Sequence, residues 1–331
     1  MMPTRFGLLA LVGALVAAGC APSGSPPPEN APADAIMPPI VVAPGRTPVV
    51  VAVGDLVCSA PLDAAWECRH DDVARVVASL APDALLLLGD LQYESGALEN
   101  FRTQFDPSFG KFRKITRPVP GNHEYATPRA RGYFDYFNGV DSATGIAGHR
   151  ARGYYSFEVG AWHVVAINSN CADLGGCGQG SAQERWLRTD LAQHRSQCLL
   201  AYWHHARFSS GGHGDSRELT AIWAALQDAR ADLVLAGHDH DYERFEPMRA
   251  DGARDAAAGI VSFVVGTGGR NLRRFGAIRS NSVMHRDNVF GVLRLTLDTG
   301  SYAWQFVDAA TEKPVDEGNG RCKGPPAAGP A

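Results

Sequence analysis

Short apolar runs that each end in polar side chains are the feature that most constrains this fold. One run, residues 84–88 (ALLLL), leads through Gly89 to Asp90, and Tyr93 follows three residues later. A short apolar run that stops at a turn residue is typical of a buried strand. Similar runs recur, and each ends near polar residues: PVVVAVGD (48–55), ITRPVPGNHE (115–124), AWHVVAINSN (161–170), QCLLAYWHH (197–205) and ADLVLAGHDH (231–240). Because ligands gather beyond the carboxyl ends of strands in α/β sheets, we expect these polar residues to converge.

Helical patterns separate several of these predicted strands. Residues 71–81 (DDVARVVASLA) and 181–195 (SAQERWLRTDLAQHR) have the spacing of apolar residues that favours helices. Alternation of strands and helices predicts an α/β domain with parallel strands. Two alternating runs within 290–308 are joined by Asp-Thr-Gly, which predicts an antiparallel hairpin. The expected fold is a single α/β domain with a mixed sheet or two stacked sheets, and with helices outside.

The N-terminal residues have the pattern of an export signal. Arg5 precedes an apolar stretch at 6–20 that is too short for a membrane span and resembles a secretory signal. The stretch ends in VAAGC, which resembles a bacterial lipoprotein box, so residues 1–20 are predicted to be a signal with Cys20 as the lipidated residue. The predicted location is the cell envelope, with the lipid anchor as the only membrane contact. The alternative is an ordinary cleaved signal peptide and a secreted soluble protein.

Composition predicts unfolded segments on both sides of the central domain. Residues 21–47 are rich in Pro and Ala, which predicts a disordered tether, and residues 323–331 are predicted to be a disordered tail. The formal net charge of −4 over 331 residues gives no reason to expect a nucleic-acid-binding surface.

The cysteine content suggests disulfides. If Cys20 carries lipid, six cysteines remain, and an even number in an exported chain favours disulfide bonds among 15 possible pairings. Short connecting loops favour two of the pairs and leave the third to hold the C-terminal end, which gives Cys58–Cys68, Cys171–Cys177 and Cys198–Cys322. None of these cysteines has zinc-finger spacing, so we do not interpret them as metal ligands.

Oxygen and nitrogen donors at the predicted strand ends are suited to binding divalent or trivalent metal ions. The candidates are Asp55, Asp90 with Tyr93, Asn122 with His123, His204, and the pair His238 and His240. Residues two apart in an extended segment point the same way, so His238 and His240 can face one site while Asp239 faces elsewhere. Four other histidines are interpreted as core or surface residues: His70, His149, His163 and His194.

The order of these motifs resembles that of the calcineurin-like metallophosphoesterases. The motifs are GD (54–55), GDLQY (89–93), GNHE (121–124), a His after an apolar strand (204) and GHDHDYER (237–244). GDLQY and GHDHDYER are similar to those of the purple acid phosphatase-like branch. The first motif, GDLVC, lacks the His that the phosphodiesterase branch carries two places after the Asp. The resemblance covers about 48–308, and it implies a sandwich of two mixed sheets flanked by helices in a catalytic domain over 48–322.

Carried over residue by residue, the resemblance implies two metal ions. The ligands of the first ion would be Asp55, Tyr93 and His240. The ligands of the second would be Asn122, His204 and His238. Asp90 would bridge the two ions. Carboxylates and a phenolate suit Fe(III) in the first site, whereas the second site, neutral apart from Asp90, suits Zn, Mn or Fe(II).

The resemblance also implies hydrolysis of phosphomonoesters by attack of a metal-activated hydroxide on phosphorus. The expected partner is therefore a small phosphate ester. In the family, the histidine that corresponds to His123 lies near the phosphate and the leaving group. We expect Glu124 to orient the imidazole of His123. His213 stands where the branch has a further His, and we expect it to contact phosphate. Two alternatives remain open: a phosphodiesterase acting on nucleotides or lipid head groups, and a non-catalytic envelope protein that binds metal or phosphate.

Overall fold

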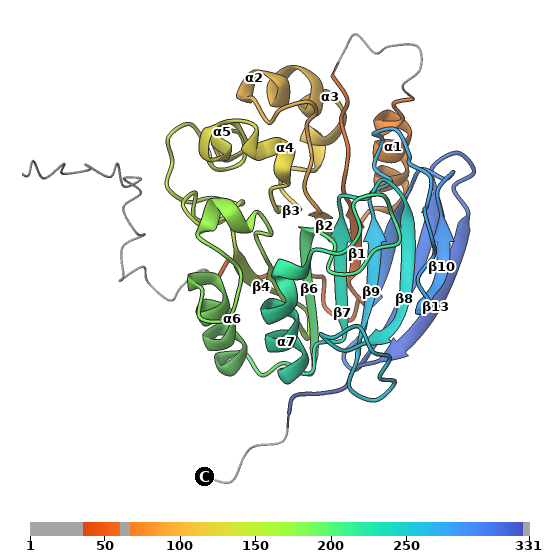
Figure 1. Ribbon diagram of the computed structural model, residues 1–331. Helices are drawn as coiled ribbons and strands as arrows, with labels where there is room; N and C mark the ends of the chain where they lie inside the picture. The colour runs from red at the N-terminus through yellow and green to blue at the C-terminus, as the bar shows by residue number, and fades with distance from the viewer. Residues whose placement is uncertain (1–35, 60–66, 327–331) are drawn as a thin grey trace, which may run out of the picture. The chain divides into compact units, whose positions relative to one another are not determined.

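Two β-sheets form the centre of the fold (Figure 1). The computed structural model describes residues 36–59 and 67–326, all of which belong to one unit, Ala33–Ala331. The first sheet contains, in spatial order, β13 (Pro314–Arg321), β12 (Ser301–Asp308), β11 (Gly291–Leu297), β1 (Val49–Val53), β2 (Ala84–Leu87) and β3 (Thr116–Pro118). The second contains β10 (Ser282–Arg286), β8 (Tyr242–Met248), β9 (Ile260–Val265), β7 (Leu233–Gly237), β6 (Cys198–His205), β5 (Trp162–Ala166) and β4 (Tyr155–Val159). Both sheets are mixed, because β1, β2 and β3 pair in parallel, as do β5, β6, β7 and β9, while the remaining neighbours are antiparallel.

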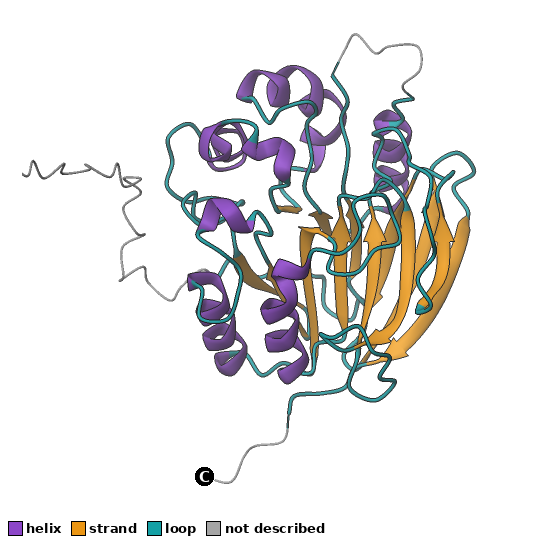
Figure 2. Cartoon of the chain, viewed as in Figure 1, coloured by secondary structure: helices purple, strands orange, loops and turns teal. Residues whose placement is uncertain are grey.

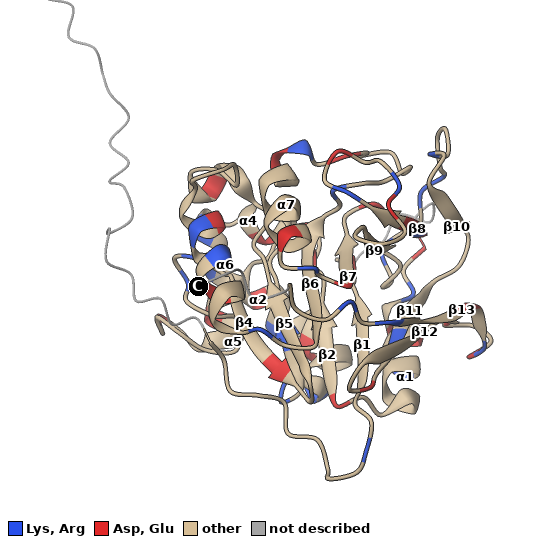
Figure 3. Ribbon diagram, turned by 90° about the horizontal axis from the view of Figure 1, so that it is seen from below, with Lys and Arg blue, Asp and Glu red and all other residues tan. Residues whose placement is uncertain are grey.

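Helices lie outside the strands (Figure 2). The α-helices of the described residues are α1 (His70–Leu80), α2 (Leu98–Asn100), α3 (Asp106–Phe109), α4 (Asn122–Tyr125), α5 (Arg131–Asn138), α6 (Ala182–Gln193) and α7 (Thr220–Asp228). The helices predicted over 71–81 and 181–195 are confirmed as α1 and α6. Seen from below, Lys and Arg are interspersed with Asp and Glu along the helices and loops (Figure 3).

The apolar runs of β1 and β2 are continuous because both strands are buried on both faces. Val50 and Leu86 pack in a core that they share with residues of the second sheet. Val51 and Leu85 pack in a separate core with residues of α1, α3 and α5. A strand that is covered on both sides has no face left for polar residues, so its sequence does not alternate. The predicted α/β sandwich of two mixed sheets flanked by helices is confirmed.

The C-terminal strands form the predicted antiparallel hairpin. β11 and β12 pair in antiparallel register from Gly291 opposite Asp308 to Leu297 opposite Tyr302. β11 also pairs with β1, which places the hairpin in the same sheet as the leucine run of β2. The hairpin therefore extends the sheet whose strands β1 and β2 lead to Asp55 and Asp90.

The structure confirms the three predicted disulfides. They are Cys58–Cys68, Cys171–Cys177 and Cys198–Cys322. The last closes a segment of 124 residues and joins the start of β6 to the residue after β13. The bond between Cys58 and Cys68 joins the loop that follows Asp55 to the residues before α1.

Parts of both segments that composition predicts to be disordered lie within the described residues. In the described part of the predicted tether, the backbone N–H groups of Met37 and Ile40 donate to Ser156 O at 2.7 Å and Glu158 O at 2.8 Å. Met37 and Ile40 pack against the core, so apolar burial holds this part of the segment along β4. In the predicted tail, the Lys323 ammonium donates to Gly259 O at 2.8 Å. Residues 1–35, which include Cys20, and 327–331 lie outside the described residues.

Candidate metal centre

Polar side chains that belong to both sheets meet at the place where the four central strands β1, β2, β6 and β7 end. Asp55 and Asp90 follow β1 and β2, His204 lies in the last part of β6, and His238 follows β7 directly. Asn122 begins α4, four residues after β3 ends. The carboxyl ends of parallel strands lie at one edge of a sheet, so these residues converge although more than 180 positions separate the first from the last.

A first group of donor atoms surrounds the phenol of Tyr93. Its Oη lies 2.8 Å from Asp55 Oδ1, 3.0 Å from His240 Nε2 and 3.2 Å from Asp90 Oδ2. The His240 Nε2 atom is also 3.4 Å from Asp55 Oδ1. All four residues are at most 2% exposed. This group contains the predicted ligands of the first ion together with the predicted bridge.

A second group of donor atoms surrounds the imidazole of His204. Its Nε2 lies 3.1 Å from His238 Nδ1 and 3.2 Å from Asn122 Oδ1. The same nitrogen lies 3.2 Å from Asp90 Oδ2. This group contains the predicted ligands of the second ion, and Asp90 Oδ2 belongs to both groups.

The spacing of these atoms fits the ligand shells of metal ions. Bonds of about 2.1 Å place neighbouring ligands about 3.0 Å apart in an octahedron and about 3.4 Å apart in a tetrahedron. The contacts within the two groups run from 2.8 to 3.4 Å, and they join oxygen and nitrogen atoms only. The residues present therefore fit two cations that share Asp90.

The backbone at three of the candidate ligands adopts the left-handed conformation. The φ angles are 62° at Asp55, 50° at Asp90 and 74° at His238. Such values are uncommon outside glycine, and they cluster at functional sites. Gly89, before Asp90, also has a positive φ of 85°, and a Cβ at this position would lie 2.7 Å from His204 Nδ1. The glycine of the LGD sequence thus permits the close approach of β2 and β6.

Hydrogen bonds from backbone carbonyls orient two of the imidazoles. His204 Nδ1–H donates to Leu88 O, and His240 Nδ1–H donates to Asn271 O, both at 2.8 Å. Because a carbonyl oxygen only accepts, each ring carries its hydrogen on Nδ1 and presents Nε2 to the donor group. This is the arrangement that fixes metal-binding histidines in proteins.

Burial and charge shape the titration of the centre. Burial and the carboxylates of Asp55 and Asp90 raise the pKa of Tyr93 well above its ordinary value. Burial lowers the pKa of His204, but Asp90 and Asp55 outweigh it and raise the value to about 9. Burial and the neighbouring histidines, His204 first, lower the pKa of His238. The protein alone keeps the phenol neutral, whereas a bound cation would favour its ionised form.

Glu124 has a different role from the one predicted. Its carboxylate accepts backbone N–H bonds from Gly121 at 2.7 Å and from Asp90 and Leu91 at 2.9 Å each. Among the described residues, the Glu124 carboxylate makes no hydrogen bond with the His123 imidazole, whose Nδ1 lies beside Glu94 O instead. The expectation that Glu124 orients His123 is therefore wrong, because its carboxylate is directed into the loop that carries Asp90. Burial and Asp90 raise the pKa of Glu124 to about 7, although the Gly121 N–H opposes the rise.

The imidazole of His123 lies at the rim of the centre. Its Nδ1 is 2.7 Å from Glu94 O, and its Nε2 is 3.9 Å from Asp90 Oδ2. The ring lies 4.2 Å from that of Tyr93, and 26% of the side chain is exposed. The Glu94 carbonyl, and not Glu124, directs Nε2 towards the shared carboxylate.

His213 lies beside the second donor group, which contains the imidazoles of His204 and His238. Its ring centroid is 4.1 Å from that of His238, and its Nε2 contacts the guanidinium of Arg273. Its backbone N–H donates to Asp239 Oδ1 at 2.8 Å. Asp239 also accepts from Ser209, so its carboxylate is directed away from the two donor groups, as predicted. All predicted site residues of the described chain lie in or beside the centre, apart from the disulfide cysteines.

Sequence reasoning did not assign roles to three further residues beside the centre. Arg270 is 5% exposed, lies 5.0 Å over the Tyr93 ring and pairs with Glu94 at 2.7 Å. Arg273 contacts His213, and its backbone N–H donates to His240 O. The third is His205, whose ring centroid lies 4.5 Å from that of His238. The glycine-rich sequence after β9 predicts a loop, but it does not predict that the arginines of this loop lie beside the metal centre.

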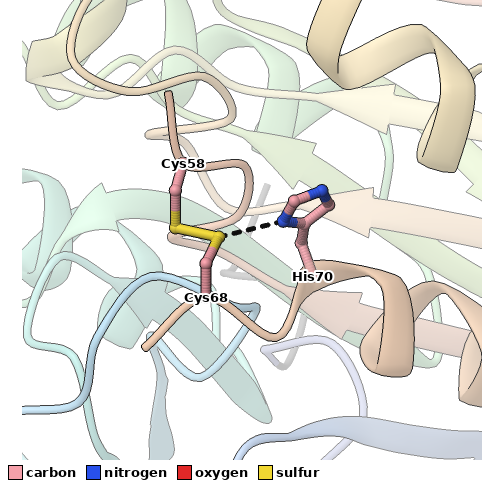
Figure 4. Close-up of side chains that lie close together, drawn as sticks. All are labelled: Cys58, Cys68 and His70. Atoms are coloured by element: carbon pink, nitrogen blue, oxygen red, sulfur yellow. Dashed lines mark hydrogen bonds between the residues drawn. A yellow bond between two sulfur atoms is a disulfide. The ribbon is translucent and has the colours of Figure 1, made fainter. Parts of the chain in front are cut away.

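The four histidines interpreted as structural have other contacts or positions. His163, in β5, places Nδ1 2.6 Å from Glu158 and Nε2 2.7 Å from Asp190, and its ring stacks on His194. His70 faces the disulfide at the start of α1, with Nδ1 3.0 Å from Cys68 Sγ (Figure 4). His149 lies in the loop before β4, where its Nδ1 accepts the Ala151 N–H.

Comparisons with known proteins agree with this geometry. The family model of the calcineurin-like phosphoesterases matches residues 48–242. Purple acid phosphatase 22 of Arabidopsis thaliana is 26% identical over 211 residues, which cover 56% of this chain and 44% of that protein. A nucleotide pyrophosphatase/phosphodiesterase of Hordeum vulgare is 25% identical over 264 residues, covering 71% of this chain and 70% of that protein. The chain thus spans less than half the length of several curated relatives that it matches.

The fold also resembles that of a solved purple acid phosphatase. The structure of PPD1 from yellow lupin (Lupinus luteus) seeds aligns with a TM-score of 0.68 and 19% identity, over 84% of this chain and 54% of that one. At this identity the likeness concerns the fold alone, and the family assignment depends on the matched residues. With a family model that covers more than half of its 331 residues, the chain belongs to the calcineurin-like phosphoesterases.

Proposed function

We propose that the chain hydrolyses phosphomonoesters at a centre that binds two metal ions, as a purple acid phosphatase-like enzyme. The observation that carries this proposal is the position of Asp90 Oδ2, which lies 3.2 Å from both Tyr93 Oη and His204 Nε2. One carboxylate oxygen thereby joins two groups of donors. Family membership and the similarity to purple acid phosphatase 22 support the reaction class.

The two donor groups differ in charge, and this difference supports the proposal that they bind different metal ions. Asp55, Tyr93 and His240 offer a carboxylate and a phenol, a set that suits Fe(III). The second group, Asn122, His204 and His238, offers neutral donors that suit Zn, Mn or Fe(II). When bound, such a pair of ions supplies an activated water nucleophile and positive charge for the phosphoryl oxygens.

The residues around the donor groups fit the remaining tasks. Glu94 O can only accept, so His123 Nδ1 donates to it, and Nε2 is left to carry a proton towards a leaving group. His213 and Arg273 lie on the side of His238 and are positioned to contact phosphate oxygens. Glu124 holds the loop of Asp90 by backbone hydrogen bonds.

A phosphodiesterase is the second candidate, and the barley relative named as a nucleotide pyrophosphatase/phosphodiesterase favours it. The donor groups serve either reaction, because both need the same nucleophile and the same charge at phosphorus. A binding protein without turnover would have no need for a proton carrier, and the position of His123 argues against that candidate.

We also propose that the protein acts outside the cytoplasm. Three disulfides are typical of exported proteins, and the signal pattern with Cys20 supports a lipid anchor. Cys20 lies outside the described residues. None of the helices within 36–59 and 67–326 is long and apolar enough to cross a membrane.

The test measures kcat/KM for an aromatic phosphomonoester and for the corresponding bis-aryl diester. It uses metal-analysed protein, with Asp90→Asn as the blank. A preference for the monoester supports the proposal, and a preference for the diester moves the protein to the second candidate. Turnover of neither ester by protein that contains two metals per chain would contradict both.

A further inference from the structure

The end of β6 departs from regular strand geometry beside the metal centre. In a regular strand, consecutive side chains point to opposite faces. The register of β6 against β7 shifts between Tyr202 and His205, as a bulge produces. The rings of both His204 and His205 therefore contact that of His238, with centroids 4.9 and 4.5 Å away. His205 joins the cluster and does not face the opposite side of the sheet.

Ser169 fixes the tautomer of His205. Ser169 Oγ accepts the backbone N–H of His205 at 2.9 Å, and it lies 2.8 Å from Nδ1 of the ring. Ser169 is 5% exposed, and within the described part of the chain its hydroxyl bonds only to these two nitrogens. Buried hydroxyls are hydrogen-bonded, so the hydroxyl hydrogen is donated to Nδ1. The neutral ring then carries its own hydrogen on Nε2.

We propose that His205 is a phosphate-binding residue whose Nε2–H donates to an oxygen of the phosphate group. Within the described residues Nε2 makes no hydrogen bond, and the ring is only partly buried. A donor next to His238 lies on the side of the centre that offers neutral imidazoles and Arg273. This side is electrostatically suited to an anion. The inference rests on the proposed function, because it assigns a donor to that same site.

The competing role for His205 is metal ligation. One ring nitrogen from each of His204, His205 and His238 lies within 4.8 Å of the others. An imidazole binds a metal through a nitrogen that carries no hydrogen. His204 donates Nδ1–H to Leu88 O and so keeps Nε2 for a cation, whereas in His205 Nδ1 accepts from Ser169 and Nε2 carries the hydrogen. The two adjacent histidines therefore differ in tautomer: one is suited to a cation and the other to an anion.

The experiment compares binding of inorganic phosphate and metal content in the metal-loaded full-length protein and its variants. His205→Gln retains an amide donor near the position of Nε2, whereas the shorter side chain of His205→Asn reaches only the position of Nδ1. Calorimetry gives the phosphate dissociation constant, and elemental analysis gives the metals bound per chain. We expect His205→Asn to weaken phosphate binding about tenfold or more, with the metal content unchanged. His205→Gln should recover most of the affinity.

Several outcomes would overturn the inference. Wild-type phosphate affinity in His205→Asn would remove the donor role, and loss of a metal ion in that variant would make His205 a ligand. His285→Asn, on an exposed histidine of β10, is the matched control and should change neither quantity. Failure of the proposed function is a separate result, because wild-type protein would then bind phosphate but hydrolyse no monoester. The comparison of affinities between wild type and variants still decides the role of His205 in that case.

Discussion

The carboxylate of Glu124 accepts a hydrogen bond from the backbone N–H of Asp90 at 2.9 Å, so one buried acid holds the loop that presents another. Glu124 is fully buried and also accepts from Leu91 and Gly121. Asp90 itself has the strained φ of 50°. The geometry of the shared carboxylate therefore depends on a residue whose own carboxylate bonds to backbone N–H groups and not to the donor atoms.

Replacing this support should loosen the centre. In Glu124→Gln, an amide –NH₂ group would face backbone N–H donors, and at least one charged hydrogen bond would be lost. We expect the free energy of unfolding to fall by about 3 kcal/mol and the metal content to fall with it. Urea unfolding and elemental analysis measure these quantities. Glu99→Gln, on an exposed residue of α2, is the control, and an equal effect there would contradict the supporting role.

Removing the charge of Asp90 should separate the two metal sites. An Asn at this position keeps the shape of the side chain but loses the anion that both donor groups share. We expect Asp90→Asn to lose at least one ion per chain and to reduce kcat/KM more than about 100-fold. Asp71→Asn, at an exposed position, should leave both unchanged. Full activity of Asp90→Asn would remove the bridging assignment.

The phenol of Tyr93 should give the iron-loaded protein its colour. A phenolate bound to Fe(III) absorbs visible light by charge transfer, and Tyr93 Oη lies among the donors of the first group. Tyr93→Phe should lose this absorption band. Tyr125→Phe, which removes a phenol bonded to Asn168, should keep it. An unchanged visible spectrum in Tyr93→Phe would show that the phenol is not a ligand.

His123 should affect turnover more than metal binding. Its imidazole borders the centre but belongs to neither donor group. We expect His123→Ala to lower kcat by about 100-fold or more, with both metals retained and with a changed pH dependence of kcat. Steady-state kinetics over a pH series, with His285→Ala as the control, measures this effect. A loss of metal with an unchanged pH profile would instead identify His123 as a ligand or a structural residue.

His163 lies outside the metal centre, and its buried imidazole should make the free energy of unfolding depend on pH. Burial lowers its pKa, but Asp190 on α6 and Glu158 on β4 outweigh burial and raise the value to about 9. Because the folded pKa lies above the unfolded value of about 6.5, the stabilisation is fully present below 6.5 and is lost as pH rises through 9. Its size is on the order of 3 kcal/mol.

The measurement compares urea unfolding of the wild type and of His163→Gln across this window. Lys323 also titrates there, since burial lowers its pKa to about 8, so the difference between the two proteins is the quantity to follow. That difference should shrink between pH 6.5 and pH 9.5. A difference that stays constant with pH would mean that His163 is neutral in the folded protein.

Sequence alone determined the central strands β1, β2, β5, β6 and β7, the ends of those strands and the types of residue that stand there. The leucine run of β2 could be predicted because burial on both faces selects continuous apolar residues. Asp55, Asp90 and His204 could be predicted as partners because the ends of parallel strands converge. The disulfides followed from short loops and an even count.

Tertiary structure decided what depends on contacts between distant loops and on backbone detail. The direction of Glu124 is set by the N–H groups of the Asp90 loop, and no local pattern encodes them. Arg270 reaches Tyr93 only because the turn after β9 folds over the centre, across more than 170 positions of sequence. His205 faces the cluster because a bulge breaks the alternation that its sequence position implies. Sequence periodicity records local burial, whereas bulges and loop contacts are fixed by the packing of one sheet against the other.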